Sequence, residues 1–305
     1  MDNLRAIKRR IKSISGIRQI TKAMEMVSAT KLKRAQARIE SARLYIEKLD
    51  EIMRDILASA TAEELEHPFT IQPDVVKRAA LVVITSDKGL CGSFNANLIR
   101  RATSMTDEGR RAGIEYSLIP IGKKGLQFFR RRNADILRTD LINIDQDLPI
   151  TLINKLYDYL VGLYAGSNPD GTEKTDTYDR IEILFALFKN AMIHRVEKMT
   201  LLPLPVGIYA GEPGGFGQTQ EYIFEPTPVD VFNDLLPQIV KMHIFSALAN
   251  TIASEHGTRM IAMRNATDNA GDLIDWLTMQ RNKARQASIT KELSDIVGGA
   301  EAQKG

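Results

Sequence analysis

The sequence predicts an α/β protein in which two long terminal helices form an antiparallel coiled coil and a central α/β domain with a mostly parallel sheet separates them along the chain. Apolar or small residues recur after Leu32 with alternating gaps of three and four, and a similar rhythm returns after Met263. This spacing is the pattern of a coiled-coil seam. Between the two segments, buried-strand patterns alternate with helical ones, which indicates parallel strands covered by helices on both faces.

The first helix is predicted to begin at Asp2 or Asn3, either of which can cap a helix, and to end before His67 and Pro68. The seam of its second half consists of Leu32, Ala35, Ile39, Ala42, Ile46, Leu49, Met53, Ile56 and Ala60. Its first half carries one apolar stripe at Leu4, Ile7, Ile11 and Ile14 and a second at Ile17, Ile20, Met24 and Val27. The step of only three residues from Ile14 to Ile17, beside Gly16, predicts that the seam shifts there and that the supercoil is locally overwound.

Three strands and three helices are predicted in the middle of the chain. The strands cover residues 79–85, 116–122 and 180–187. The helices cover residues 95–103, 125–132 and 149–165. The first strand is a continuous apolar run rich in β-branched residues, which is typical of a strand buried on both faces. The alternation predicts a Rossmann-like α/β domain, and the glycine-rich, polar segments 166–178 and 207–220 are predicted to be surface loops.

Helical character returns after Pro226-Thr227-Pro228, and Pro237 is predicted to mark a kink or a first turn. The seam of this last helix consists of Met263, Ala266, Ala270, Leu273, Leu277, Gln280, Ala284 and Ala287. The helix is predicted to end at Val297, because Gly298 and Gly299 follow. The chain is therefore divided into an N-terminal helix (1–70), a central domain (71–228) and a C-terminal helix that pairs with the first (229–305).

Composition and charge favour a soluble globular protein with an acidic partner. Of the 305 residues, 26% are charged and 44% hydrophobic, and no apolar run approaches the roughly 20 residues that would cross a bilayer. A single cysteine, Cys91, excludes an internal disulfide. Residues 1–34 hold ten Lys and Arg against two acidic residues, a net charge of +8 that leaves −5 for the rest of the chain. Such a basic helix end favours nucleic acid, lipid headgroups or an acidic protein surface, although a solvated helix face gives the same pattern.

No catalytic residue, metal site or cofactor site is predicted. The turn 85–95 follows a strand and precedes a helix, where phosphate-binding loops lie, but it lacks both glycine motifs of such loops. A tight structural turn is the favoured interpretation. The four histidines have no metal-ligand spacing, and Cys91 is interpreted as a small buried residue rather than a nucleophile. A mechanical or interaction role follows.

Four segments resemble the γ subunit of bacterial F-type ATP synthases. They are ITKAMEMV at 20–27, SDKGLCG at 86–92, RMIAM with ATDN at 259–269, and NKARQASIT at 282–290. The resemblance covers nearly the whole chain in the same order, and the differences lie mainly in the segments 166–178 and 207–220. The cysteine-bearing regulatory insertion of chloroplast relatives is absent.

The resemblance implies a fold, a set of partners and a mechanism. The paired terminal helices would enter a ring of alternating α and β subunits, and the α/β domain would contact the ε subunit and the membrane rotor of c subunits. Proton flow would turn the rotor, and the shaft would push the β subunits, where ATP chemistry occurs, through different conformations. The chain itself would be a non-catalytic, peripheral protein on the cytoplasmic side of the cell (inner) membrane, with no direct membrane insertion and no cofactor.

The resemblance also assigns shaft positions that meet the β subunits. They are Lys22, Met24, Arg259, Arg285, Gln286 and Thr290. Two alternatives remain at this point. A coiled-coil protein could bind nucleic acid through its basic first segment, although residues 1–34 contain no aromatic residue for base stacking. A nucleotide-binding α/β enzyme could use the turn after Thr85.

Overall fold

The computed structural model describes residues 2–59, 65–144, 147–166, 177–205 and 225–302. The chain divides into two compact units, which we call the coil unit (residues 1–30 and 259–305) and the sheet unit (residues 31–258). Both terminal helices contribute to both units: α1 covers Asp2–Ser59 and α5 covers Pro228–Ala302. The sequence placed its boundaries near residues 70 and 228, and that three-part division stays a prediction.

The sheet unit contains a four-stranded sheet in the order β2-β1-β3-β4. The strands are β1 (Arg78–Ile84), β2 (Glu115–Ile121), β3 (Arg180–Phe188) and β4 (His194–Leu202). Strand β1 pairs in parallel with both β2 and β3, which confirms the predicted parallel sheet, and β4 is antiparallel to β3 at one edge. The sequence analysis missed β4. Charged and apolar residues are mixed along it, and only its last two residues are buried, so it lacks the continuous apolar run that marked the other strands.

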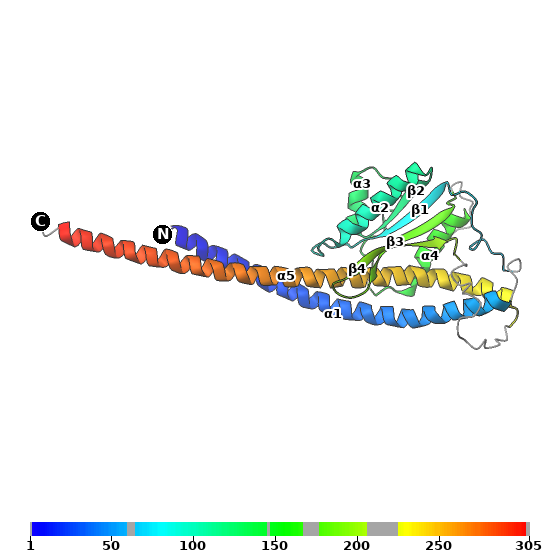
Figure 1. Ribbon diagram of the computed structural model, residues 1–305, viewed down its shortest axis with the longest axis horizontal. Coiled ribbons are helices and arrows are strands. Elements are labelled where there is room, and N and C mark those ends of the chain that lie inside the picture. The colour runs from blue at the N-terminus through cyan, green and yellow to red at the C-terminus, as the bar shows by residue number, and fades with distance from the viewer. Residues whose placement is uncertain (1, 60–64, 145–146, 167–176, 206–224, 303–305) are drawn as a thin grey trace. The chain divides into compact units, whose positions relative to one another are not determined.

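Helices cover both faces of the sheet (Figure 1). On one face lie α2 (Phe94–Arg111) and α3 (Lys123–Arg131), which pack on Leu81, Val83 and Leu184. On the other face lie α4 (Ile150–Ala165) and the parts of α1 and α5 that belong to this unit. Because successive residues of a strand point to opposite faces, β1, which is apolar from Ala79 to Ile84, supplies both cores at once. Each core residue of β1 therefore stabilises one of the two helical layers.

The inner part of the helix pair belongs to the larger core. Leu49, Met53 and Ile56 of α1 share it with Leu236 and Ile239 of α5. The predicted seam residues Leu32, Ala35 and Ala42 are also buried, so this part of the α1 seam is confirmed. Its last predicted member, Ala60, lies outside the described residues.

The terminal helices differ from the predictions at the end of α5 and in the position of Pro237. Helix α1 is described only as far as Ser59, and the next described residues, 65 and 66, are not helical. Helix α5 continues through Gly298 and Gly299 to Ala302, so the predicted stop at Val297 is wrong. A helical glycine costs about 1 kcal/mol relative to alanine, which weakens a helix without ending it. Pro237 lies well inside α5, so it does not mark a first turn, and the predicted kink stays a prediction. Most of the predicted loops 166–178 and 207–220 falls outside the described residues.

A close contact joins the carboxyl ends of β1 and β2. The backbone N–H and the hydroxyl of Thr85 both donate to the carbonyl of Ile121 at 2.8 Å, and the hydroxyl also accepts from the N–H of Gly125 at 2.9 Å. Gly122 adopts a φ of 92°, and an added Cβ there would overlap the carbonyl of Thr85. Only glycine fits this position without moving the backbone.

Left-handed backbone strain alone costs a non-glycine residue about 1–2 kcal/mol. We expect Gly122→Ala to destabilise the sheet unit by more than this, because the added Cβ also overlaps the backbone of Thr85. Gly113→Ala is the matched control, since Gly113 has a φ of 77° but no atom within 4 Å of an added Cβ. Urea unfolding of the two variants measures the difference. Equal unfolding free energies would contradict the proposed close contact.

Candidate functional site

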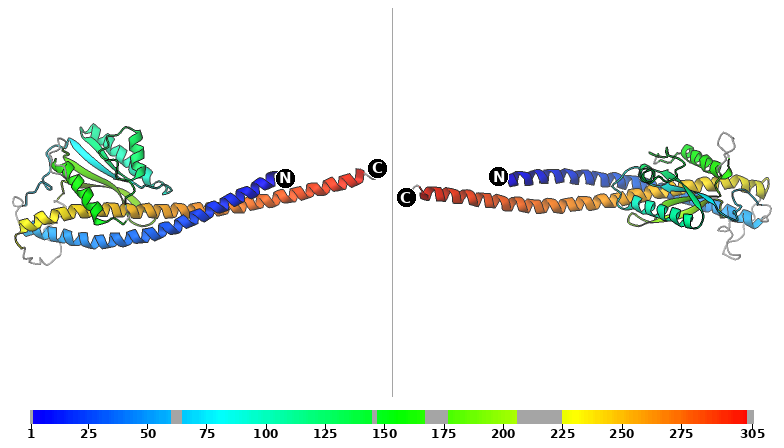
Figure 2. Two further views of the ribbon diagram at one scale, coloured as in Figure 1. Left: turned by 180° about the vertical axis from the view of Figure 1, so that it is seen from behind. Right: turned by 90° about the horizontal axis from the view of Figure 1, so that it is seen from above.

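In the coil unit α1 and α5 lie side by side and run in opposite directions (Figure 2). The hydroxyl of Thr267 donates to that of Thr21 at 2.8 Å, and Arg264 Nε donates to Glu25 at 3.2 Å. The guanidinium carbon of Arg18 lies 3.7 Å from where a Cβ on Gly271 would stand. Partner numbers fall along α5 as they rise along α1. These contacts confirm the predicted antiparallel pairing of the chain's two ends.

The seam of α1 in this unit does not shift at Gly16, and the predicted overwinding step is wrong. Thr21, Glu25 and Ser28 are buried and carry the spacing of four and three directly into Leu32. The residues that were predicted to form the shifted stripe lie mostly outside: Ile17, Ile20 and Val27 are 51%, 62% and 57% exposed. Thr21 and Glu25 can hold seam positions because Thr267 and Arg264 on α5 form hydrogen bonds with them, which offsets the cost of burying them.

The seam of α5 follows the prediction at every second position. Met263, Ala270 and Leu277 are buried. The intervening seam position is Thr267 rather than Ala266. Leu273, Gln280 and Ala287 are exposed where they were predicted to pack. The α5 seam therefore also passes through a polar residue. At every second position it lies one residue further along the chain than the apolar pattern predicted.

Glu25 is the centre of this polar part of the seam. Its carboxylate accepts from Lys22 Nζ at 3.1 Å and from Arg264 Nε at 3.2 Å, and only 7% of its side chain is exposed. The hydrogen bond from Lys22, aided by Arg264, holds the pKa of Glu25 below its ordinary value, although burial acts in the opposite direction. The group therefore stays ionised at neutral pH, which suits a structural ion pair and not a general acid.

The six residues that the resemblance assigned fall into two groups. Lys22 is half exposed beside Glu25, Met24 is partly buried, and Arg259 is buried on α5. The other three, Arg285, Gln286 and Thr290, are exposed further along α5. At 1.5 Å per residue, Arg259 and Arg285 lie roughly 39 Å apart along the helix, so the two groups are separate surfaces. Their contact with a partner stays a prediction.

Large apolar side chains are exposed along the coil unit. Their exposed fractions run from 43% to 68%. They are Ile17, Ile20, Met26 and Val27 on α1, and Leu273, Trp276, Met279, Ile289, Leu293, Ile296 and Val297 on α5. Scattered exposed apolar residues are normal, but a concentration of this kind marks an interaction surface. Sequence reasoning missed this surface because it placed several of these residues in the seam.

Among the described residues of the coil unit, the last part of α5 has no partner from α1. Each inter-helix contact joins residues whose numbers add to 288 or 289, so Leu4 lies level with residues 284–285. Beyond that level α5 continues as a single helix (Figure 2). Ile289, Leu293 and Ile296 repeat at gaps of four and three, which puts them on one face of this helix.

The turn after β1 is braced by its own side chains. The N–H of Ser86 donates to the side-chain oxygen of Asn95 at 3.0 Å, and Asp87 accepts from the N–H of Lys123 at 2.9 Å. Cys91 is only 2% exposed. These contacts support the structural interpretation of the turn and confirm that Cys91 is buried.

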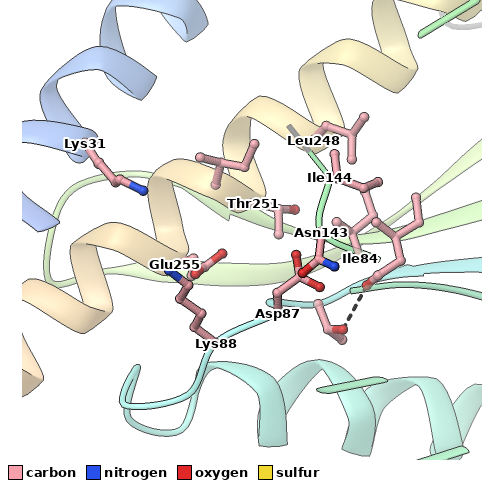
Figure 3. Close-up of a pocket in the computed structure, with 12 residues that line it drawn as sticks. Lys31, Ile84, Asp87, Lys88, Asn143, Ile144, Leu248, Thr251 and Glu255 are labelled. Carbon is pink, nitrogen blue, oxygen red and sulfur yellow. Dashed lines mark hydrogen bonds between the residues drawn. The ribbon is translucent and has the colours of Figure 1, made fainter. Parts of the chain in front are cut away.

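A small cavity lies beside this turn, at the carboxyl ends of β1 and β2 (Figure 3). Its volume of about 230 Å³ is below the roughly 300 Å³ at which small-molecule pockets begin. Its lining mixes Lys31, Asp87, Lys88 and Glu255 with aliphatic residues. Over the described residues, no group of three or more His, Cys, Asp or Glu side chains could hold a metal ion, and no helix is long and apolar enough to span a bilayer.

Relatives of this chain cover its whole length. It is 41% identical over 304 residues to the ATP synthase gamma chain of Halothermothrix orenii, and each chain is covered completely. The gamma chain of a Geobacter strain is 40% identical over 305 residues with the same coverage. A family model described as ATP synthase matches residues 3–303. The chain belongs to the ATP synthase gamma family. The resemblance seen in the sequence is therefore confirmed.

Solved structures agree with this membership. A chain from the central stalk and c-ring of the Tetrahymena thermophila mitochondrial ATP synthase is 29% identical, has a TM-score of 0.57, and is matched over 99% of its length by 81% of this chain. A chain of the Euglena gracilis enzyme is 18% identical with a TM-score of 0.68, covering 99% of this chain and 95% of that one. The second match shows the fold alone. None of these relatives supports the nucleic-acid-binding or nucleotide-enzyme alternatives for this gamma-family chain.

The ion pair at Glu25 gives a pH dependence. The pKa of Glu25 is lower in the folded chain than in the unfolded chain. The ionised carboxylate therefore stabilises the fold at pH values above the unfolded-state pKa, and this stabilisation is lost as the pH falls through the folded-state pKa. We expect Glu25→Gln to cost about 1 kcal/mol at neutral pH, since both cations stay half exposed.

Helix melting followed by circular dichroism measures the effect. Between about pH 6 and about pH 3, a span that brackets the ordinary carboxylate range, the melting temperature should fall more in the wild type than in Glu25→Gln. The control is Glu40→Gln, because Glu40 is 61% exposed in its pair with Arg43. An identical acid response in wild type and Glu25→Gln would overturn the role given to this carboxylate.

Proposed function

We propose that this chain is the central shaft of a bacterial F-type ATP synthase and couples proton-driven rotation of the membrane rotor to conformational cycling of the catalytic β subunits. The observation that carries the proposal is the exposed apolar surface of the coil unit in a chain of the gamma family. Water-exposed apolar surface is costly, at about 25 cal/mol per Å². A ring of partner subunits that surrounds the coil unit would remove this cost.

The coil unit has the asymmetry that such a shaft requires. One part is a helix pair with apolar side chains on its outer faces, and another part is the single helix beyond residue 285. A turning shaft can shift a partner's conformational equilibrium only if it contacts the partner's states with different free energy. Surfaces that differ around the axis supply such differences, whereas a uniform cylinder would not.

The two groups of assigned residues then have separate roles. Lys22 and Met24 would meet the β subunits along the helix pair, and Arg285, Gln286 and Thr290 would meet them at the end of the pair and beyond it. Arg259 is only 5% exposed, so it would act on β through the side chains that cover it. Guanidinium and amide groups suit polar loops because they form charge-assisted and amide hydrogen bonds. The +8 charge of residues 1–34 would suit acidic loops on β, and each rim contact would be weak because salt screens it.

The remaining partners follow from the same assignment. The sheet unit would contact the ε subunit and the c-subunit ring, and the α and β subunits would form the ring around the coil unit. ATP chemistry would take place on β, so this chain would act without a catalytic residue or a cofactor of its own. It would be a peripheral protein on the cytoplasmic side of the cell membrane.

Replacing Ile17, Ile20 and Val27 together by serine should impair assembly but not folding. The three side chains are more than half exposed, so the chain alone should lose no more than about 0.5 kcal/mol per site. Burial against partner subunits would be lost, at roughly 1.5–3 kcal/mol per side chain. Recovery of the α–β–γ complex on size exclusion measures this loss.

The matched control replaces Ile71, Val75 and Ile150 by serine, because these residues of the sheet unit are 48–65% exposed. Their replacement should leave complex recovery unchanged. Normal recovery of the coil-unit variant would argue against an enclosing ring.

Replacing Arg285 and Gln286 together by alanine tests the coupling itself. We expect lower ATP turnover and lower ATP-driven proton pumping in the reconstituted complex, because polar contacts made in only some β conformations would be lost. The control is Arg100→Ala with Gln127→Ala, which removes the same two chemical groups from exposed positions in the sheet unit. Wild-type turnover and pumping in the first variant would remove the assigned role of this pair.

A further inference from the structure

Five arginines gather at one edge of the sheet unit. Arg110 and Arg111 lie at the end of α2, and Arg130, Arg131 and Arg132 lie at the end of α3. Each helix follows a strand of the parallel pair β1 and β2 and runs back across the sheet, so both helices end at the edge where those strands begin. We call these five residues the arginine edge. They are far apart in sequence but are brought together by the topology.

The arginine edge is exposed and only partly compensated by carboxylates, of which Glu108 interacts with Arg111. All five side chains are exposed. Among the described residues, Arg110, Arg111, Arg130 and Arg131 make no side-chain hydrogen bond or ion pair, and Arg132 stacks over Phe128 at 4.7 Å. Three carboxylates lie close to these five arginines along the chain, Asp107, Glu108 and Glu115, which leaves a net charge of +2. Like charges collected in this way repel one another unless an anionic surface faces them.

Stabilisation of the helix ends explains only part of this arrangement. A cation near a helix C-terminus offsets the helix dipole, and the effect is confined to the last turn. One or two cations per helix would be enough for that purpose. The helix dipole does not account for five arginines against three carboxylates at one edge.

The surroundings favour a diffuse anionic surface over a protein partner. Specific protein interfaces have an apolar centre rich in aromatic residues. No large hydrophobic side chain is exposed among the described residues between Leu90 and Ile150, a stretch that contains α2, α3 and the arginine edge. In contrast, the coil unit has many such side chains. Arginine without apolar neighbours suits phosphate groups spread over a surface.

We propose that the arginine edge is a contact surface for the anionic lipid headgroups of a membrane. The proposal rests on the proposed function only in that the latter places the chain beside a membrane. A basic residue near an anionic bilayer contributes about 1 kcal/mol, which is about fivefold in binding. The attraction falls off within a Debye length, about 8 Å at physiological salt. Such a contact would hold weakly and without a fixed register, so it would not oppose rotation.

The test uses the full chain and phosphatidylcholine vesicles with or without phosphatidylglycerol. A fluorophore on Gln127→Cys, an exposed position of α3, reports quenching by lipids that carry a headgroup quencher. The buried native Cys91 should remain unlabelled. We expect salt-sensitive quenching with anionic vesicles and none with neutral ones.

Replacing Arg110, Arg111, Arg130 and Arg131 by glutamine should weaken the binding reported at Gln127 by about fivefold per residue, whereas replacing them by lysine should preserve it. Replacing Lys8, Arg9, Arg10 and Lys12 by glutamine changes the charge equally in the coil unit and should leave the Gln127 signal in place.

Three results would overturn the proposal: unchanged quenching in the glutamine variant, equal loss in the coil-unit variant, or binding to an isolated c-subunit ring without binding to vesicles. The last result would identify a protein partner. The vesicle assay needs no assembled complex, so its failure is distinct from a failure of the coupling test on Arg285 and Gln286.

Discussion

A single unbroken heptad spacing governs how the two ends of the chain pair. Between Leu4 and Ile56 the seam of α1 advances by alternating steps of three and four, and it continues through Thr21 and Glu25 because Thr267 and Arg264 satisfy them across the interface. A helix in a two-helix pair has one inward stripe. Once polar residues hold that stripe, the neighbouring apolar residues must face outward. The polar seam therefore explains why Ile17, Ile20 and Val27 are exposed on the helix pair, and it leaves apolar surface there that a surrounding partner could cover.

The sequence predicted those parts of the fold that follow from apolar periodicity. Strands β1, β2 and β3 lie within one residue of their predicted ends because their runs are apolar and continuous. The same criterion failed wherever polar groups are satisfied by tertiary contacts. Apolar periodicity predicted a seam at Ile17 on α1 and at Ala266 instead of Thr267 on α5. It did not predict β4, which mixes charged and apolar residues at a sheet edge. The prediction that Gly298 and Gly299 end the last helix was also wrong, since α5 continues to Ala302.

The candidate site could be predicted only through the resemblance. Catalytic sites reveal themselves by convergent polar groups, but a surface that acts by touching other subunits has no such chemistry within one chain. Arg285 and Gln286 have no features in the sequence that separate them from other exposed residues. The structure adds the distinction between the buried Arg259 and the exposed group further along α5. It also separates the two kinds of surface: apolar along the coil unit, and basic without apolar residues at the arginine edge.

Disulfide formation between introduced cysteines tests the central claim most directly, because it reads the register of the helix pair. Thr21→Cys with Thr267→Cys places the two sulfurs where hydroxyl oxygens now lie 2.8 Å apart, so the polar-seam register predicts rapid cross-linking. Ile20→Cys with Ala266→Cys tests the alternative register, in which the apolar residues predicted from the sequence would form the seam. We expect this second pair to cross-link poorly. Both pairs are made in a variant whose native Cys91 is replaced by serine. Cross-linking of the second pair in preference to the first would contradict the account.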